Sequence, residues 1–442
     1  MIQGRETASP LRWCRPLSWA RRLSANRTPS AVLATAQRRI IGTPQARELQ
    51  SLGILRWIAE RATMLDDGAV FLDEFCSKLR DSGMPLWRMS VVVPAIDPSV
   101  RGFNVEWQRE RGTSLLSAAY ADEGMGGFER SPLHAILADG RSSARWRLDG
   151  SLDPATAIPE LVDLQAEGGT DYVLHLIWFA PGTALKGVAV SFATDAWSGF
   201  SDDDLAMLAE TLAPLGLAMC KFSLSRTLHE TLGIYLGSDT SSRVLGGNIR
   251  RGEGETITAA ILLADLRAFT ALADRDDPLK VVGWLDEYFD AIGEPVARCG
   301  GEILKFTGDG FLAIFRVQDP ENQSSAICGM ALDAAEEALS LNRALNNRRR
   351  SMGLPELEVD LVLHFGDVVY GNVGTSRRLD FTVIGRAVNE ASRIEELCDD
   401  AGRSILVSDT FAARCQRPLE IVGSYALRGL ERKQLIWAPL RK

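Results

Sequence analysis

The chain has 442 residues, of which 46% are hydrophobic and 24% are charged, and its formal net charge is -9 at pH 7. This length can hold two or three domains with cores of their own, and the composition is that of an ordinary globular protein. The negative charge argues against a nucleic-acid partner, because polyanion binding needs a basic face. A small nucleotide stays compatible with it, since a metal can supply positive charge locally.

Seven cysteines occur without any C-x-x-C pair, which indicates reduced thiols rather than a disulfide framework or a zinc site. The longest apolar run, from Tyr172 to Ala180, is far shorter than the roughly 18–20 residues that cross a bilayer. We therefore expect a soluble, cytoplasmic protein without a membrane span.

Residues 1–47 are rich in arginine and contain a single acidic residue, Glu6. This composition is typical of a transit peptide or a basic arm. It also fits a disordered tail, or a start codon placed too far upstream, and we expect one of these two.

Residues 48–220 mix helix and strand patterns. Two helices are predicted first, and four strand-like runs follow, in 49–65, 71–83, 86–96, 102–112, 171–181 and 185–195. Ser201, followed by three aspartates, is predicted to cap a further helix. Trp87, Trp107 and Trp178 are expected in the core. The order and rhythm of these elements resemble a GAF-type (GAF/PAS-like α/β) sensor domain, which implies a small-molecule or protein signal that the sequence does not identify.

Residues 221–247 are predicted to join this domain to a second one at 248–442. Leucines at helical spacing predict a helix or helix pair from Leu205 to Leu236, and turn formers fill 237–247. A long helix entering a second domain suits a parallel dimer contact, and a simple packing helix fits the same pattern.

The second domain opens with a continuous apolar strand that ends at Asp265, as expected for a strand buried on both faces. A helix, a hairpin, a second helix, two strands, a third helix and two final strands are predicted next, in 278–299, 302–315, 324–350, 357–374, 382–398, 405–411 and 435–440. The order strand–helix–strand–strand–helix–strand predicts a ferredoxin-like, palm-type α+β fold.

Two aspartates of this domain are candidate metal ligands. Asp265 ends an apolar strand, and Asp309 lies in a turn between Gly308 and Gly310, whose backbones can bend sharply. Two carboxylates that meet across adjacent strands repel each other unless a cation lies between them, and magnesium suits such a site. Read separately, each aspartate is also compatible with a turn residue or a strand-end cap.

Four stretches, 261–272, 300–315, 363–374 and 379–397, resemble the catalytic domain of class III adenylate and guanylate cyclases in their order and spacing. The likeness spans roughly residues 235–442. It implies catalysis with two divalent ions, Mg²⁺ or Mn²⁺, in each active site.

The resemblance also implies a role for each matching position. Asp265, Leu266 and Asp309 would hold the two ions. The backbone amides around Phe269 and Thr270, which open the next helix, would cradle the triphosphate.

The remaining matching positions would act on the base, the ribose and the phosphates. Lys305 and Thr382 would select the base, Asn389 would orient the ribose, and Arg393 would neutralise charge that develops on the phosphates. Asn389 and Arg393 lie four residues apart and therefore share a helix face. Lysine offers only donors, which match the N1 acceptor of adenine, so Lys305 favours ATP as substrate.

A Gly300-Gly301-Glu302 run looks at first like the signature of a diguanylate cyclase. In that family the acids of the Gly-Gly motif occupy the hairpin turn, whereas here the turn falls at Asp309. We therefore expect the glycine pair to shape the entry to a strand. One departure from the cyclase pattern is Ala268, which stands where the family usually has glycine.

In the cyclase family, each active site lies between two catalytic domains, one supplying the metal carboxylates and the other the remaining residues. This chain carries both sets, so the resemblance implies a homodimer with two equivalent sites. We predict a homodimeric adenylate cyclase that converts ATP to cyclic AMP and pyrophosphate under the control of the N-terminal sensor. A guanylate cyclase and a non-catalytic nucleotide-binding signalling module stay as the alternatives.

Overall fold

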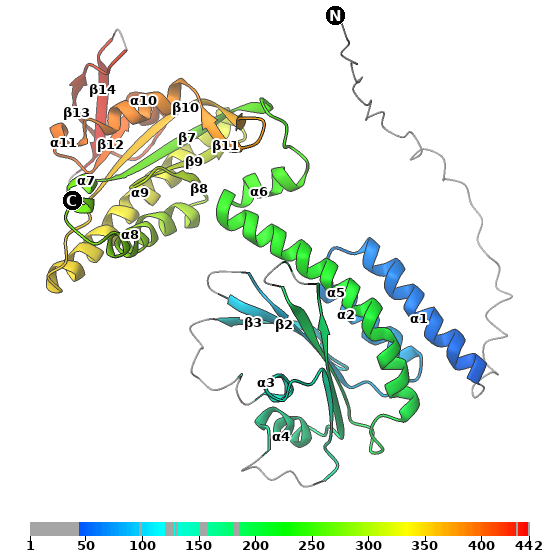
Figure 1. The fold of residues 1–442 in the computed structure, drawn as a ribbon. Helices are drawn as coiled ribbons and strands as arrows, with labels where there is room; N and C mark the ends of the chain where they lie inside the picture. The colour runs from blue at the N-terminus through cyan, green and yellow to red at the C-terminus, as the bar shows by residue number, and fades with distance from the viewer. Residues whose placement is uncertain are drawn as a thin grey trace, which may run out of the picture.

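A computed structural model describes residues 44–442, apart from 97–99, 120–127, 129–130, 151–156, 181, 183–184, 430–431 and 441–442. The arginine-rich segment predicted at 1–47 lies outside the described residues except for its last four, which begin the first helix. The described chain forms two sheets with their own helices, joined by one long helix (Figure 1).

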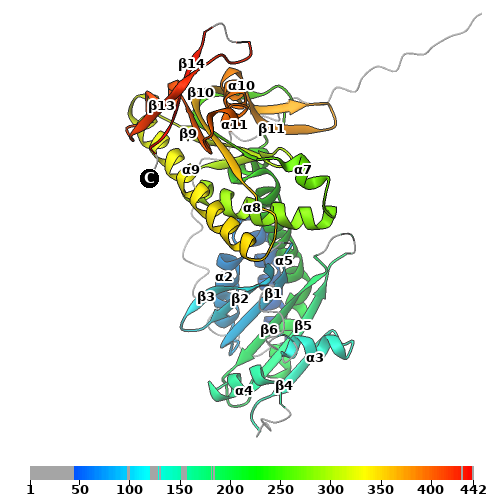
Figure 2. The same cartoon turned by 90° about the vertical axis from the view of Figure 1, so that its left-hand side faces the viewer.

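The N-terminal part is built on one antiparallel sheet of six strands in the order β3-β2-β1-β6-β5-β4. The strands are β1 (Arg88–Pro94), β2 (Val100–Gln108), β3 (Gly112–Ala119), β4 (Ser143–Arg147), β5 (Asp171–Trp178) and β6 (Gly187–Thr194). The helices are α1 (Pro44–Met64), α2 (Gly68–Asp81), α3 (Pro132–Ala138) and α4 (Pro159–Ala166). α2 lies on one side of the sheet and α3 and α4 lie on the other (Figure 2). Side chains of α1 and α2 belong to one hydrophobic core and those of α3 and α4 to another.

The predicted helices and strands of this part are all present, while β3, β4, α3 and α4 were not predicted. Trp87 and Trp107 are buried as expected. The expectation for Trp178 was wrong, because 59% of this residue is exposed at the end of β5.

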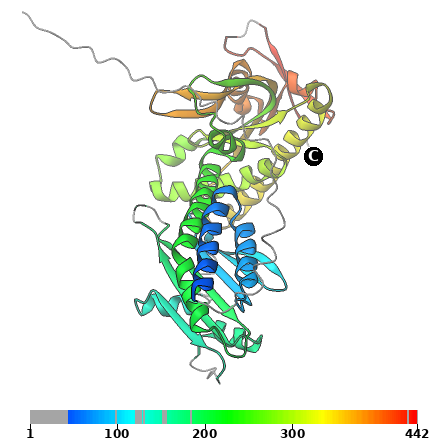
Figure 3. The same ribbon diagram turned by 90° about the vertical axis from the view of Figure 1, so that its right-hand side faces the viewer.

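A single helix, α5 (Asp202–Leu236), leaves this sheet and runs to the second one beside α1 (Figure 3). Ser201 caps it as predicted, and Asp204 completes a capping box with the Ser201 backbone. Within the described part of the chain, α5 is the one helix long and apolar enough to cross a membrane. Its residues Leu208, Leu215 and Met219 are buried in the core beneath α1 and α2.

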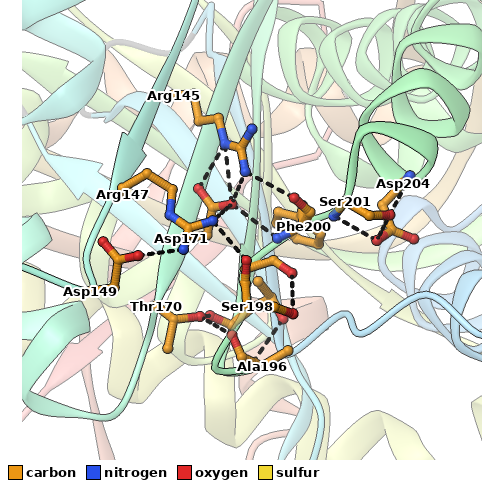
Figure 4. Close-up of polar contacts among 12 residues, drawn as sticks. Arg145, Arg147, Asp149, Thr170, Asp171, Ala196, Ser198, Phe200, Ser201 and Asp204 are labelled. Atoms are coloured by element: carbon orange, nitrogen blue, oxygen red, sulfur yellow. Dashed lines mark hydrogen bonds and ion pairs between the residues drawn. The ribbon is translucent and has the colours of Figure 1, made fainter.

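The start of α5 is fastened to the N-terminal sheet by a buried aspartate (Figure 4). Asp171 on β5 is fully buried and accepts a hydrogen bond of 2.6 Å from Arg145 on β4. It also accepts one of 3.0 Å from the backbone N–H of Phe200, while Arg145 donates to the Phe200 carbonyl at 2.9 Å. Because Phe200 precedes the capping residue, this network fixes where the helix begins.

The C-terminal sheet has the order β13-β14-β12-β10-β7-β9-β8, with β11 paired to β10 outside this path. Its strands are β7 (Gly254–Leu266), β8 (Glu302–Phe306), β9 (Phe311–Val317), β10 (Val359–Gly374), β11 (Leu379–Ile384), β12 (Ile405–Ser408), β13 (Leu419–Tyr425) and β14 (Gln434–Pro439). Its helices are α6 (Ser238–Leu245), α7 (Phe269–Ala273), α8 (Pro278–Arg298), α9 (Pro320–Ser351), α10 (Arg386–Glu395), α11 (Cys398–Ala401) and α12 (Asp409–Ala412). α8 and α9 pack on one face of this sheet and α10 on the other.

The four strands β10, β7, β9 and β8 are antiparallel neighbours, connected by α8 and α9 in the predicted ferredoxin-like order. One expectation was wrong. Residues 357–374 were predicted as two strands, but 359–374 form the single strand β10, whose pairing with β7 continues without a break from Val359 to Gly371.

Candidate active site

The two predicted metal carboxylates lie at one end of the central strands. Asp265 is the penultimate residue of β7, and Asp309 lies in the turn between β8 and β9. Gly310 makes this approach possible, because a Cβ at that position would meet the carbonyl of Ala264 and lie 2.9 Å from Oδ1 of Asp265. The glycine therefore lets the turn lie directly against the end of β7.

The electrostatics at Asp265 fit a cation. Burial raises the pKa of the Asp265 carboxyl to about 6, and the negative charges of Asp309 and Asp360 add to this shift. The Leu266 backbone N–H, which hydrogen-bonds Asp265, works in the opposite direction. Burial and like charge both disfavour the ionised form of the carboxyl, and a bound divalent cation would favour it.

The rest of the local donor set limits how such a cation could be held. The Leu266 side chain is 2% exposed, so only its backbone can take part. Asp360 is already bound by the Arg267 guanidinium. No group of three or more His, Cys, Asp or Glu side chains that could hold a metal occurs among the described residues. The pair Asp265 and Asp309 therefore suits magnesium or manganese completed by water and substrate phosphate.

Sequence reasoning missed one further acid beside this pair. Glu395, near the end of α10, is half-buried, and burial together with Asp265 and Asp360 raises its pKa to about 7. Nothing in the local sequence marks Glu395, because it reaches this position only through the packing of α10 over β7 and β10.

The predicted phosphate turn follows β7 directly. Phe269 and Thr270 are the first residues of α7, a helix of five residues. Ala268 precedes them with a φ of 57°, and it is the one non-glycine residue with positive φ among those described. Because that region of backbone space favours glycine, the family's usual glycine at this position has a conformational reason.

The two predicted base-reading residues come from β8 and β11, which lie near each other. Lys305 is partly buried and follows an irregularity in the β8–β9 pairing between Ile303 and Lys305. Thr382 is 4% exposed, and its buried Oγ1 has no hydrogen-bond partner among the described residues. A buried hydroxyl without a partner is uncommon, and a bound ligand would satisfy it.

Asn389 and Arg393 lie on α10 as predicted, one turn apart. Asn389 is exposed and Arg393 is partly exposed, so both can reach a substrate. The Arg393 guanidinium lies next to Gly429, after β13.

The predicted residues fall into two groups within one chain. Asp265 and Asp309 lie together at the end of β7 and in the β8–β9 turn, and the charge of Asp309 contributes to the raised pKa of Asp265. Lys305 and Thr382 lie on β8 and β11, which contact each other, and Asn389 and Arg393 lie on α10.

Comparison with known proteins gives a consistent result for this part of the chain. Residues 253–437 match the model of the adenylate and guanylate cyclase catalytic domain. An adenylate cyclase from Anabaena cylindrica is 34% identical over 42% of this chain and 35% of its own length. Adenylate cyclase 1 from Rhizobium meliloti is 38% identical over 35% of this chain and 23% of its own length.

Both relatives are therefore much longer than the segment they share with this chain. Among solved structures, a guanylyl cyclase is similar, with 28% identity, a TM-score of 0.37, and coverage of 42% of this chain and 92% of its own. Residues 253–437 of the chain match the adenylate and guanylate cyclase catalytic family.

Proposed function

We propose that the protein is a homodimeric adenylate cyclase that converts ATP to 3′,5′-cyclic AMP and pyrophosphate. The observation that carries the proposal is the pair Asp265 and Asp309, held together by Gly310 in a half-buried site where burial and like charge raise the pKa of Asp265 to about 6. A half-buried pair of acidic side chains suits a site for divalent ions and a polyphosphate.

In the proposed reaction, the ribose 3′-hydroxyl attacks the α-phosphorus and pyrophosphate leaves. Bound divalent ions would lower the pKa of this hydroxyl and offset the charge of the triphosphate. The protein's own contribution is positioning and charge stabilisation. Asn389 would hold the ribose, and Arg393 would stabilise the phosphates, because a guanidinium is planar, bidentate and permanently charged.

The choice of ATP rests on Lys305 and Thr382. Lysine can donate to N1 of adenine but not to the protonated N1 of guanine. The Thr382 hydroxyl can donate or accept, so Lys305 would carry most of the discrimination. Its half-buried position on β8 supports this role, because a mismatched base would leave buried polar groups unpaired.

The homodimer is proposed from the cyclase resemblance, in which one catalytic domain supplies the metal carboxylates and the other supplies the remaining residues. A second copy would place its Lys305 and Arg393 against Asp265 and Asp309. Two identical copies would then form two equivalent sites.

The test is direct. The purified full chain, incubated with ATP and Mg²⁺ or Mn²⁺, should release cyclic AMP, and Asp309→Ala should abolish the product. Mixing inactive Asp309→Ala with inactive Arg393→Ala chains should restore about a quarter of the activity, because half of the randomly paired dimers keep one intact site. Turnover of GTP alone would select the guanylate alternative, and bound but intact ATP would select the non-catalytic module.

The N-terminal domain is proposed as a sensor that controls this activity. A cavity of about 660 Å³ on its sheet supports a small-molecule signal, because its walls are mostly apolar, with Leu116, Leu133, Leu176 and Trp178 among them. Cyclase rates of the full chain and of a chain starting near residue 231 should differ, and the sign of the difference would show whether the domain activates or inhibits. Equal rates would speak against control.

The proposal places the enzyme in the cytoplasm, with one face of α5 packed in the N-terminal core. Three apolar residues of that face, Leu208, Leu215 and Met219, are buried against the N-terminal sheet, which supports a helix that packs on protein rather than lipid.

A further inference from the structure

The short helix α6 packs against the C-terminal sheet at β8 and β10. Thr240 and Ser241 of α6 are 1% and 4% exposed, so this helix is packed rather than loosely attached. Gly237 joins it to α5 with a φ of 85°. This positive φ favours glycine, and a Cβ at Gly237 would lie 2.8 Å from Oε1 of Glu302, so the turn lies directly against β8.

Three polar side chains make the contact between α6 and the sheet. Oε1 of Glu302 accepts a hydrogen bond of 3.3 Å from the backbone N–H of Thr240. The hydroxyls of Thr240 and Tyr370 lie 2.9 Å apart, and the Tyr370 hydroxyl donates to Oε2 of Glu302 at 3.3 Å. Tyr370 is 1% exposed, so the network is shielded from water and its bonds are costly to break.

A charged contact fixes the other end of α6. The Arg243 guanidinium lies 4.9 Å from the centre of the Tyr370 ring. It also forms an ion pair of 2.8 Å with Glu255 on β7, which in turn pairs with Arg316 on β9 at 2.7 Å. α6 is therefore held to β7, β8 and β10, and Glu255 links this contact to Arg316 on β9.

Glu302 lies on the strand that carries Lys305, and Tyr370 lies on β10, which pairs with the strand that carries Thr382. Glu302 opens β8, and the irregularity in its pairing with β9 separates it from Lys305 on the same short strand. The Tyr370 ring contacts Phe381 edge to face, with centroids 4.7 Å apart and planes at 86°. Phe381 directly precedes Thr382, so displacement of Tyr370 would move the strand that presents the Thr382 hydroxyl.

We infer that Glu302 and Tyr370 are positioning residues for base recognition, and that docked α6 holds Lys305 and Thr382 in register through them. The inference rests on the proposed function and adds a specific role for the Gly-Gly-Glu run, whose acid binds α6 instead of metal. It makes nucleotide selection depend on a contact outside the active site.

The test removes one hydroxyl from each side of the contact. Tyr370→Phe keeps the ring against Phe381, and Thr240→Val keeps the shape of the α6 side chain. Each variant should raise the KM for ATP about five- to tenfold, the effect of one lost buried hydrogen bond, and should lower the ATP-to-GTP preference while kcat changes less than twofold. The control is Tyr425→Phe on β13, which should leave KM and preference unchanged.

The double variant Tyr370→Phe with Thr240→Val decides the mechanism. If the two hydroxyls belong to one network, the rise in KM in the double variant should be clearly smaller than the product of the two single effects. Unchanged KM and preference in both single variants, or a fall in kcat alone, would overturn the inference. Failure of the unmodified full chain to make cyclic AMP would instead contradict the proposed function, and binding of a fluorescent ATP analogue would then replace KM as the readout for the same variants.

Discussion

At the scale of single residues, Gly310 decides whether the metal site can exist. Any side chain there would push into the Ala264 carbonyl and the Asp265 carboxylate. We expect Gly310→Ala to lower the free energy of unfolding by about 2 kcal/mol and to remove most cyclase activity, because the clash is with backbone that cannot move cheaply. The control is Gly329→Ala within α9, where a Cβ meets open space, and equal effects of the two changes in chemical denaturation would contradict the explanation.

Ala268 tests a second backbone requirement. Its φ of 57° costs a non-glycine residue about 1–2 kcal/mol, whereas glycine would lose about 0.4–1 kcal/mol through its freer unfolded chain. The backbone strain removed by glycine is larger than the entropy cost that glycine adds. Ala268→Gly should therefore stabilise the protein by about 0.5 kcal/mol, measured as a rise of the unfolding midpoint. A lower midpoint would mean that surrounding contacts make Ala268 unstrained.

The acidic site should also make stability depend on pH and magnesium. Asp265 and Glu395 have pKa values raised to about 6 and about 7 in the fold, above their ordinary values. Between roughly pH 4 and 7 the folded state therefore binds more protons than the unfolded state, so the free energy of unfolding falls as pH rises.

The expected result is a metal-free melting temperature that falls through this window, and a Mg²⁺-induced rise that is larger at pH 8 than at pH 5. His364 works in the opposite direction, since burial lowers its pKa to about 4. The control is therefore Glu395→Gln, which keeps His364 and should flatten the fall. An unchanged slope in this variant would contradict the assignment to Glu395.

At the scale of elements, the start of α5 depends on one buried carboxylate. Asp171→Asn would leave Arg145 without its charged partner and weaken the hold on Phe200. We expect a loss of about 2 kcal/mol in the free energy of unfolding, at the low end for a buried pair because Arg145 is 31% exposed. Asp203→Asn, whose partner Arg47 is exposed, is the matched control and should cost at most about 0.5 kcal/mol.

The measurement is chemical denaturation of the Asp171→Asn and Asp203→Asn variants. The loss in the free energy of unfolding should be larger for Asp171→Asn. Similar small losses would mean that the Asp171 network is dispensable and that hydrophobic packing alone fixes the helix start.

Helices and strands could be predicted where their buried face leaves a pattern of apolar residues in the sequence. Strands and helices with a continuous apolar face, such as β7 and α5, were predicted because the pattern itself reports burial. The exposed-and-intermediate alternation of β4 gives no such signal, and Gly366, Gly371 and Gly374 made β10 look interrupted. Gly371 instead lies where the Glu253 and Gly254 backbone approaches too closely for a side chain.

Some residues of the candidate site could be predicted from the sequence and others could not. Asp265, Asp309, Asn389 and Arg393 were predicted from local motifs, which carry their own spacing. Glu395 and the contact of Glu302 with α6 were not, because both arise where segments distant in the sequence pack together.

At the scale of the whole molecule, α5 carries an exposed apolar stripe. Leu217, Leu224, Leu228 and Tyr235 are 75%, 46%, 50% and 80% exposed. Their spacing at about 100° per residue puts them on one face, as in the seam of a two-stranded coiled coil. This face is suited to contact with the second copy that the proposed active site would require.

We expect the full chain to have the mass of a dimer in light scattering at micromolar concentration. Replacing Leu224 and Leu228 together by glutamate should shift it toward monomer and reduce cyclase activity in parallel, because charge would be buried in the seam. Met352→Glu, at an exposed position after α9, is the control. A dimer that persists in the double variant would place the contact elsewhere.

The continuity of α5 has a mechanical consequence. Its 35 residues correspond to a helix length of about 52 Å, from the anchor at Phe200 to Gly237. Pro214 interrupts the backbone hydrogen bonds near the anchored end, and the 22 residues after it can transmit a change in tilt or rotation to Gly237. Gly237 has the backbone freedom to absorb or release that motion, which makes this one residue the natural place to uncouple the two halves of the molecule.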